Sequence, residues 1–320
     1  MMRTQIYKNA VSSNAFIALG LSIVLGIVGH FISPGFSSFS NILNILVIAS
    51  FLGVLALAQT IVMITDSGGI DLSVGAILLI SMIFIAQIYQ TSGGSFVTAV
   101  AIALSVCFIL GLVNGVFITL LKIPPILMTL AMSSVIIGII LIFTGGFPTG
   151  MAPRALSRFI FARTLYLPNM VWVWMFITAF AMFVTRCTKI GRVMYGVGAN
   201  RLVAELSGVS TRRARALAYG VSGLLCGIAG VFLLGFVSAP NNLAIGERYV
   251  MPSIAASVIG GVSLSGGEGT YVGTVTGVIF LTMLEALLMT VQISEPARRI
   301  VFGVVIILIL INHARKNRKI

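Results

Sequence analysis

Long apolar stretches divide this chain, and they constrain its fold more than any other feature. A helix needs about 20 predominantly apolar residues to cross the hydrocarbon core of a bilayer. Charged residues make up only 8% of the sequence, against about 25% in a soluble domain, so an ordinary globular protein is excluded. The sequence predicts an all-α polytopic membrane protein, a single transmembrane domain over residues 1–320, with about ten spans at residues 14–33, 42–65, 70–90, 95–121, 125–145, 169–187, 216–238, 249–264, 270–291 and 297–312.

Basic residues predict the orientation of these spans. The net charge of +13 comes from Lys and Arg in short segments between apolar runs, which is the pattern that orients membrane helices rather than one that binds nucleic acid. With the N-terminus inside, fourteen basic residues fall on the cytoplasmic side and six outside. We therefore expect an N-in, C-in topology. The outer loop 146–168 is either a patch for an acidic soluble partner or a plain translocated loop, and it holds Arg154, Arg158 and Arg163.

Glycine patterns predict close helix packing and two irregular segments. Gly111 with Gly115, and Gly273 with Gly277, have the small-xxx-small spacing that favours helix association in lipid; we expect this packing inside one subunit, with a contact between subunits as the alternative. Residues 67–76 (SGGIDLSVGA) and 259–268 (IGGVSLSGGE) echo each other, although so short a likeness also arises by chance. Each is either a cytoplasmic hairpin or a re-entrant element that lines a pathway, because irregular backbone at membrane depth must be covered by protein or water.

The longest polar interruption is the loop 188–215. Its segment 201–207 has polar ends and an apolar centre, as expected of a short helix that presses into a groove on another protein. Asn200 precedes this segment as the expected N-cap. We predict a docking platform for a cytoplasmic partner that supplies the driving force; a loop that binds lipid headgroups is the alternative. The basic residues of the loop are Lys189, Arg192, Arg201, Arg212, Arg213 and Arg215.

Few polar side chains fall within the predicted spans. Glu285 lies well inside one, where an acid is costly unless it faces water or a partner; it lines a pathway or forms an interhelical hydrogen bond. Asp71 precedes the third span, and we favour a helix cap over a ligand role for its carboxylate. Asn114 and Gln59 either donate to a hydroxylated solute or bond to a neighbouring helix. The candidate substrate pathway consists of Asp71, Ser73, Asn114 and Glu285.

Patterns for catalysis and metal binding are absent from the sequence. It lacks the phosphate loop G-x-x-x-x-G-K-[ST], so we expect no ATP hydrolysis by this chain. Its two histidines stand alone, and its three cysteines lie in or beside apolar spans without metal-ligand spacing. We expect the cysteines to be small buried hydrophobes, and the chain to be a non-enzyme with no cofactor and no metal.

Four segments, spread over nearly the whole chain, carry a resemblance to a known family. They are TDSGGIDLSVGA (65–76), GLVNGVFITLLKIPPILMTL (111–130), GRVMYGVGANRLVAELSGV (191–209) and IAASVIGGVSLSGGEGTYVGTVTG (254–277). On these residues the chain resembles the permease subunit of bacterial ABC importers of monosaccharides, the ribose, xylose, arabinose and galactose type. The resemblance implies a translocation subunit of the inner membrane that imports a monosaccharide or similar polyol by alternating access.

The resemblance also implies partners and site residues. The expected partners are a second permease subunit, identical or related, a cytoplasmic ABC ATPase with two fused nucleotide-binding domains that hydrolyses the ATP, and a periplasmic sugar-binding protein, besides membrane lipid. In the family, the segment that matches residues 191–209 contains the coupling helix that docks on the ATPase. This role carries over to Gly191, Arg192, Tyr195, Gly196, Gly198, Asn200, Glu205 and Gly208.

Three alternatives stay open from the sequence. The first is an importer of the same fold for another solute: a branched-chain amino acid, a nucleoside or a furanosyl signal. The family commonly carries Asn near the position of Glu285, so the charge in this chain leaves the solute undetermined. The second is a proton-coupled secondary transporter with Asp71 or Glu285 as the proton site. The third, a membrane scaffold without transport, is disfavoured by the polar and glycine-rich elements.

Overall fold

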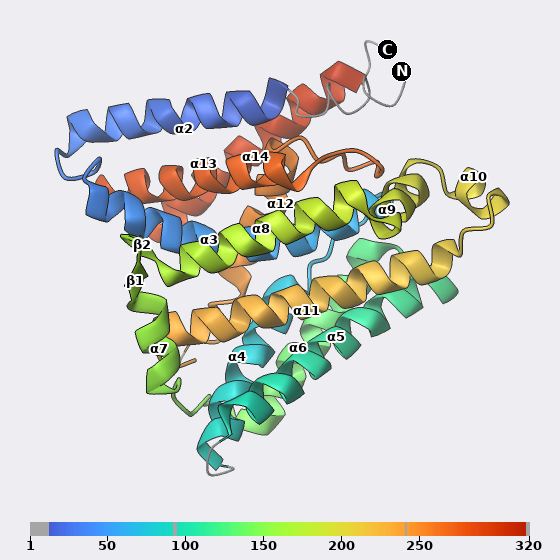
Figure 1. The fold of residues 1–320 in the computed structure, drawn as a ribbon, viewed down its shortest axis with the longest axis horizontal. Helices are drawn as coiled ribbons and strands as arrows, with labels where there is room; N and C mark the ends of the chain where they lie inside the picture. Colours follow the sequence, from blue (N-terminus) through green and yellow to red (C-terminus); the bar gives the residue numbers. More distant parts are fainter. Residues whose placement is uncertain (1–12, 92–94, 241, 318–320) are drawn as a thin grey trace.

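Helices make up nearly all of the structure (Figure 1). The computed structural model describes residues 13–91, 95–240 and 242–317, with side chains described from residue 15 to residue 305 outside the same gaps and at residue 307. The terminal basic residues used in the orientation argument, such as Arg3 and Lys319, lie outside these ranges. The elements are α2 (Ser13–Ile32), α3 (Phe39–Thr65), α4 (Val74–Thr91), α5 (Phe96–Leu120), α6 (Pro125–Thr144), α7 (Arg154–Phe161), β1 (Arg163–Thr164), β2 (Leu167–Pro168), α8 (Asn169–Cys187), α9 (Lys189–Ala199), α10 (Arg201–Leu206), α11 (Thr211–Val237), α12 (Glu247–Ile259), α13 (Tyr271–Thr290) and α14 (Glu295–Asn317).

Eight of the described helices are long and apolar enough to cross a membrane, which confirms the all-α polytopic class. They are α2, α3, α4, α5, α6, α8, α11 and α13. The predicted span 249–264 is wrong: α12 has 13 residues, or about 20 Å, and the hydrocarbon core is about 30 Å thick. The helix ends there because the chain turns at Gly261, whose φ is 90°. The predicted span 297–312 falls in α14, where most side chains beyond residue 305 lie outside the described part.

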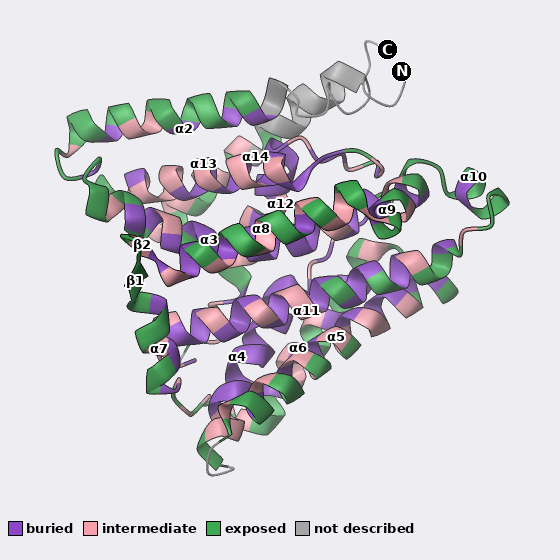
Figure 2. Ribbon diagram, in the orientation of Figure 1, coloured by how far each residue is buried: buried purple, intermediate pink, exposed green. Residues whose placement is uncertain are grey.

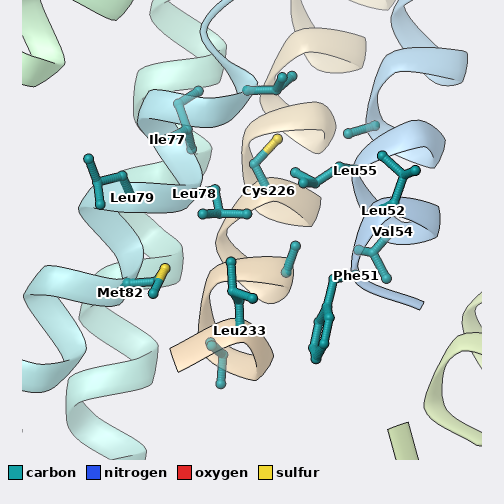
Figure 3. Close-up of a cluster of buried hydrophobic side chains, with 14 of the residues drawn as sticks. Phe51, Leu52, Val54, Leu55, Ile77, Leu78, Leu79, Met82, Cys226 and Leu233 are labelled. Carbon is teal, nitrogen blue, oxygen red and sulfur yellow. The ribbon is translucent and has the colours of Figure 1, made fainter. Parts of the chain in front are cut away.

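The apolar core lies between α3, α4 and α11 (Figure 3). A helix that is hydrophobic on every face is expected to be buried, and α3 carries no charged residue over its 27 positions. By contrast, α2 is exposed along most of its length (Figure 2), as a helix that faces lipid should be. The side chains that fill the core include Phe51, Leu52, Leu55, Ile77, Leu78, Met82, Cys226 and Leu233.

Glycines bring helix backbones together within this one chain, as the small-residue spacing predicts. A Cβ on Gly111 of α5 would overlap the carbonyl oxygen of Tyr219 on α11. Likewise, a Cβ on Gly273 of α13 would overlap the carbonyl oxygen of Gly260 at the end of α12. The predicted packing inside one subunit is therefore confirmed for these glycines.

The two ends of the bundle differ. The predicted outer loop forms α7 and the antiparallel pair β1–β2 at the left of Figure 1, where Arg154, Arg158 and Arg163 are exposed. At the opposite end lie α9 and α10, next to the end of α3 and the start of α11. The cysteine prediction is wrong at this end, because Cys187 at the end of α8 is exposed, whereas Cys107 and Cys226 are buried.

Candidate functional site

The loop 188–215 folds as two short helices and a turn. The hydroxyl of Thr188 accepts a hydrogen bond from the amide of Gly191 at 3.4 Å and caps α9. The side-chain oxygen of Asn200 accepts from the amide of Val203 at 3.1 Å and caps α10. The predicted N-cap at Asn200 is therefore confirmed. Both caps satisfy amides that a helix start leaves free, so the local sequence sets where each helix begins.

Glu205 connects α10 to α11. Its carboxylate pairs with Arg201 one turn earlier at 3.2 Å, and it accepts a hydrogen bond from the hydroxyl of Thr211, the first residue of α11. The hydrogen bonds from Thr211 and Arg201 hold the pKa of the Glu205 carboxyl below its ordinary value. Gly208 follows with a φ of 80°, a conformation that glycine adopts without strain. The turn between α10 and α11 is thus specified by Glu205 and Gly208 together.

The inner surface of α9 fits against the end of α3 and the second glycine-rich segment. Gly198 leaves no room for a Cβ, because the carbonyl oxygen of Ile64 at the end of α3 and the amide of Gly267 occupy that position. One turn earlier, the hydroxyl of Tyr195 donates to the carbonyl oxygen of Gly269 at 2.7 Å. If α9 is displaced, it must therefore push on or separate from the end of α3 and the segment after α12.

The other predicted residues of α9 divide between packing and exposure. Gly191 packs against α8, where a Cβ would overlap the carbonyl oxygen of Thr185. Arg192 and Gly196 are exposed. With Lys189 and several valines they line a pocket of about 460 Å³ between α9 and α10. This pocket has a basic rim and an apolar floor, and it opens on the same end of the bundle as α10.

The outer surface of α10 is apolar. Leu202, Val203 and Leu206 are 66%, 57% and 81% exposed, whereas Ala204 is buried against the rest of the segment. A group of exposed apolar side chains on one short helix is typical of a surface that binds another protein. We call Leu202, Val203 and Leu206 the apolar face of α10.

The two echoing segments are hydrogen-bonded to each other. The amide of Gly68 donates to the carbonyl oxygen of Leu264 at 2.8 Å, and the amide of Gly267 donates to that of Ile64 at 2.9 Å. We refer to residues 66–73 as loop A and to residues 260–270 as loop B. The first bond joins the two loops, and the second joins loop B to the last turn of α3, so the two loops meet where α3 ends.

Loop A re-enters the bundle after α3 ends. In the orientation of the amide that satisfies both groups, Gln59 donates to the carbonyl oxygen of Asp71 at 3.2 Å and accepts from its amide at 3.1 Å. Gln59 stands six residues before the end of α3, or about 9 Å inside it. The re-entrant alternative is therefore the one that the structure adopts for loop A, and α4 begins inside the bundle.

Three of the four predicted pathway residues meet at the tip of loop A. Asp71 accepts from both the amide and the hydroxyl of Ser73, at 2.9 and 2.6 Å, and from the hydroxyl of Ser222 on α11 at 3.1 Å. The side chain of Asn114 on α5 donates to the hydroxyl of Ser73 at 2.9 Å. All four side chains are buried. The preferred cap role for Asp71 is not confirmed, because the amide that it accepts is that of Ser73, which precedes α4; the bond closes a turn just before the helix.

Glu285 stands apart from this cluster. It lies fourteen residues after the start of α13, or about 21 Å along the helix from loop B. Its side chain is half-buried, close enough to Arg298 and Arg248 for their charges to act on it. The structure therefore places Glu285 toward the outer end of the bundle, among charged residues, rather than with Asp71.

The sequence did not predict an ion pair at the start of loop A. Asp66 and Arg215 form a buried salt bridge at 2.7 Å, and the hydroxyl of Tyr219 lies 3.4 Å from the same carboxylate oxygen. A signal was present: Asp66 ends an apolar run and Arg215 is the last basic residue before another. A second missed feature is the buried hydroxyl of Thr60, which bonds to Ser257 at 3.1 Å and to Thr274 at 2.8 Å.

These features define a multi-pass membrane permease, in which the segment 188–215 is packed against the end of α3 and loop B. The chain belongs to the family described as branched-chain amino acid transport system / permease component, which matches residues 41–310. The family and the apolar helices place the chain in the bacterial inner membrane. No solved structure matches the chain.

Its similar proteins include import permeases for two kinds of solute. The ribose import permease protein RbsC of Escherichia coli K12 is 32% identical over 303 residues, which cover 93% of each chain. RbsC of Bacillus subtilis 168 is 35% identical over 304 residues, covering 93% of this chain and 92% of the relative. The autoinducer 2 import system permease protein LsrC of Escherichia coli is 30% identical over 303 residues, covering 92% of this chain and 86% of the relative. The resemblance to the permease subunits of ABC importers is confirmed.

Proposed function

We propose that this chain is the translocation subunit of an ATP-driven importer of a monosaccharide or similar small polyol. Relatives named for ribose import support this class of solute. The relative named for autoinducer 2 import and the description of the family keep a different small solute as the second candidate. The chain itself needs no cofactor in this proposal, because ATP is bound and hydrolysed by a partner.

The observation that carries the proposal is the contact of α9 with the end of α3 and with loop B. Gly198 is wedged between the end of α3 and loop B, and Tyr195 is bonded to loop B. Loops A and B are bonded to each other. A push on α9 therefore acts directly on the end of α3 and on loop B, which leads into α13. This is the mechanical connection that a separate motor requires.

The surfaces at the two ends suggest where partners bind. A cytoplasmic ATPase with two fused nucleotide-binding domains receives the apolar face of α10, with the basic rim of Lys189 and Arg192 beside it. A second permease subunit, identical or related, completes the pore. A periplasmic binding protein delivers the solute to the outer end, where α7 exposes its arginines. Gly191, Arg192, Tyr195, Gly196, Gly198, Asn200, Glu205 and Gly208 form or support the coupling segment.

In this mechanism ATP binding closes the ATPase and pulls on the coupling segments, which rearranges loops A and B and opens the pore outward. Hydrolysis returns it inward. An uncharged polyol needs only weak hydrogen bonds on its way, because the binding protein supplies the affinity. Asp71, Ser73 and Asn114 belong to the moving region in this proposal, and Glu285 belongs to its outer part.

Reconstitution tests the proposal. Vesicles that contain this chain, its partner ATPase and the binding protein should take up labelled ribose or a related sugar only with ATP, and vesicles that lack the ATPase should take up none. The variant Glu205→Arg/Gly208→Pro should assemble and hydrolyse ATP without uptake. Uptake that persists without the ATPase, driven by a proton gradient, would replace this function with proton-coupled transport.

A further inference from the structure

One face of α11 holds loop A at both of its ends. Arg215 pairs with Asp66 at the start of the loop, and Ser222 donates to Asp71 near its tip. Tyr219, between them on the helix, donates to Asp66 as well. The spacing 215, 219, 222 is i, i+4, i+7, which forms a single stripe along a helix.

Between these two attachments the loop is built to bend. Gly68 has a φ of 71°, and no atom stands within 4 Å of where its Cβ would be. Glycine has the widest conformational freedom of any residue. The loop is therefore held by α11 at its ends, and Gly68 lets its backbone bend between them.

The start of α11 is in turn fixed to α10. Thr211 donates to Glu205, and Arg215 follows one turn later. Since a helix transmits displacement as a rigid rod over a few turns, a movement of α10 reaches Asp66 through Thr211 and Arg215. This route is separate from the contact of α9 with Gly267 and Gly269.

The attachments are incompletely satisfied in this conformation. Among the described residues, two buried side-chain atoms lack a hydrogen-bond partner: Nε of Arg215 and Oδ1 of Asn114. One belongs to the attachment at Asp66, and the other to the residue that bonds to Ser73. A buried polar group without a partner is costly, and a two-point pairing of Arg215 with Asp66 would use the free Nε. A second arrangement of loop A that gives both atoms a hydrogen-bond partner would therefore be favourable at both of its ends.

We propose that Arg215, Tyr219 and Ser222 form a lever on α11 that moves loop A, and that Arg215 is the positioning residue that connects α10 to this loop. The proposal rests on the proposed function, because it assumes that α10 receives force from an ATPase. It assigns to α11 the transmission of that force to the inner end of α4.

The test follows loop A directly. Ser67 is exposed at the start of the loop, so Ser67→Cys in a Cys187→Ser background gives a position for a membrane-impermeant maleimide. In the reconstituted complex with the ATPase, the labelling rate of this parent should change when ATP is added. In Asp66→Asn/Arg215→Met that change should fall about tenfold, with ATP hydrolysis retained. Both charges are removed together because a single loss would leave an uncompensated buried charge.

Two further variants complete the test. Arg186→Met removes an exposed charge in the last turn of α8, outside the loop 188–215, and should behave as the parent does. Tyr219→Phe/Ser222→Ala removes two hydroxyls and no charge, and it should partly reduce the change in labelling rate that ATP causes. If Asp66→Asn/Arg215→Met does not assemble with the ATPase, this second variant tests the lever in its place. If the parent shows ATP-driven uptake and both Asp66→Asn/Arg215→Met and Tyr219→Phe/Ser222→Ala keep the full change in labelling rate, the lever is wrong and the proposed function stands. A parent without ATP-driven uptake overturns the proposed function.

Discussion

Gly198 of α9 lies so close to Ile64 of α3 that a Cβ on the glycine would overlap the isoleucine's carbonyl oxygen, and that Cβ would stand only 2.6 Å from the amide nitrogen of Gly267. We predict that Gly198→Ala forces α9 away from loop B. Overpacking of this kind costs about 1–3 kcal/mol, and it should lower the sugar transported per ATP hydrolysed. The measurement is uptake against ATP hydrolysis in reconstituted vesicles.

The same helix offers a matched control. A Cβ on Gly196 would meet no atom within 4 Å, and alanine favours a helix over glycine. Gly196→Ala should therefore leave stability and coupling unchanged or slightly improved. If both variants behave alike, close packing of α9 on the paired loops is not what couples the two activities.

The apolar face of α10 should bind the ATPase. Leu206 is 81% exposed, and burial of a leucine side chain is worth about 1.5–3 kcal/mol. Leu206→Ser should therefore weaken binding of the ATPase to the detergent-solubilised chain by about tenfold or more. Co-purification and a binding isotherm with the purified ATPase measure the effect.

A leucine at the opposite end provides the comparison. Leu165, in the turn between β1 and β2, is 76% exposed and lies on the other side of the bundle (Figure 1). Leu165→Ser should leave ATPase binding unchanged. Equal losses in both variants would indicate a general defect of the protein, and no loss in Leu206→Ser would place the docking surface elsewhere.

Local chemistry made parts of this structure predictable. The cap at Asn200 depends on a residue and its own helix, so the sequence pattern was sufficient. The glycine spacing likewise predicted close packing at Gly111, but it did not identify α11 as the partner. The membrane class follows from composition alone. The length of α12 was misjudged because an apolar run continues through Gly260 and Gly261, and hydropathy does not register a turn that glycines make.

Long-range pairing was not predictable from the same information. Asp66 and Arg215 are 149 positions apart, and Thr60 and Thr274 are 214 apart. Each residue has a plausible local explanation, as a charge at a span end or a hydroxyl in a helix. Only the packing of α3, α11 and α13 decides the partner. For the same reason the sequence grouped Glu285 with Asp71, although they lie at different depths in the bundle.

The link between α10 and α11 should depend on pH through Glu205. Its pKa is lowered from the ordinary value of 4.5 by Thr211 and Arg201, so its stabilising effect is complete above pH 4.5 and is lost as the pH falls through the lower folded value. Thr211→Val should raise this pKa toward 4.5. Carboxyl ¹³C NMR of labelled glutamate, titrated in detergent, measures both values. A pKa that Thr211→Val leaves in place would show that the hydroxyl does not stabilise the carboxylate.

The hydroxyl of Tyr271 joins three helices in the buried interior. It accepts from the indole nitrogen of Trp174 at 2.9 Å and donates to the carbonyl oxygen of Gly53 at 2.8 Å. Tyr271→Phe leaves both groups without that partner, so it should destabilise the chain by about 1–3 kcal/mol. Thermal unfolding in detergent, followed by tryptophan fluorescence, should show a lower midpoint, while Tyr166→Phe, at an exposed tyrosine, should not change it. Equal midpoints for the two variants would mean that α3, α8 and α13 are held together by apolar packing alone.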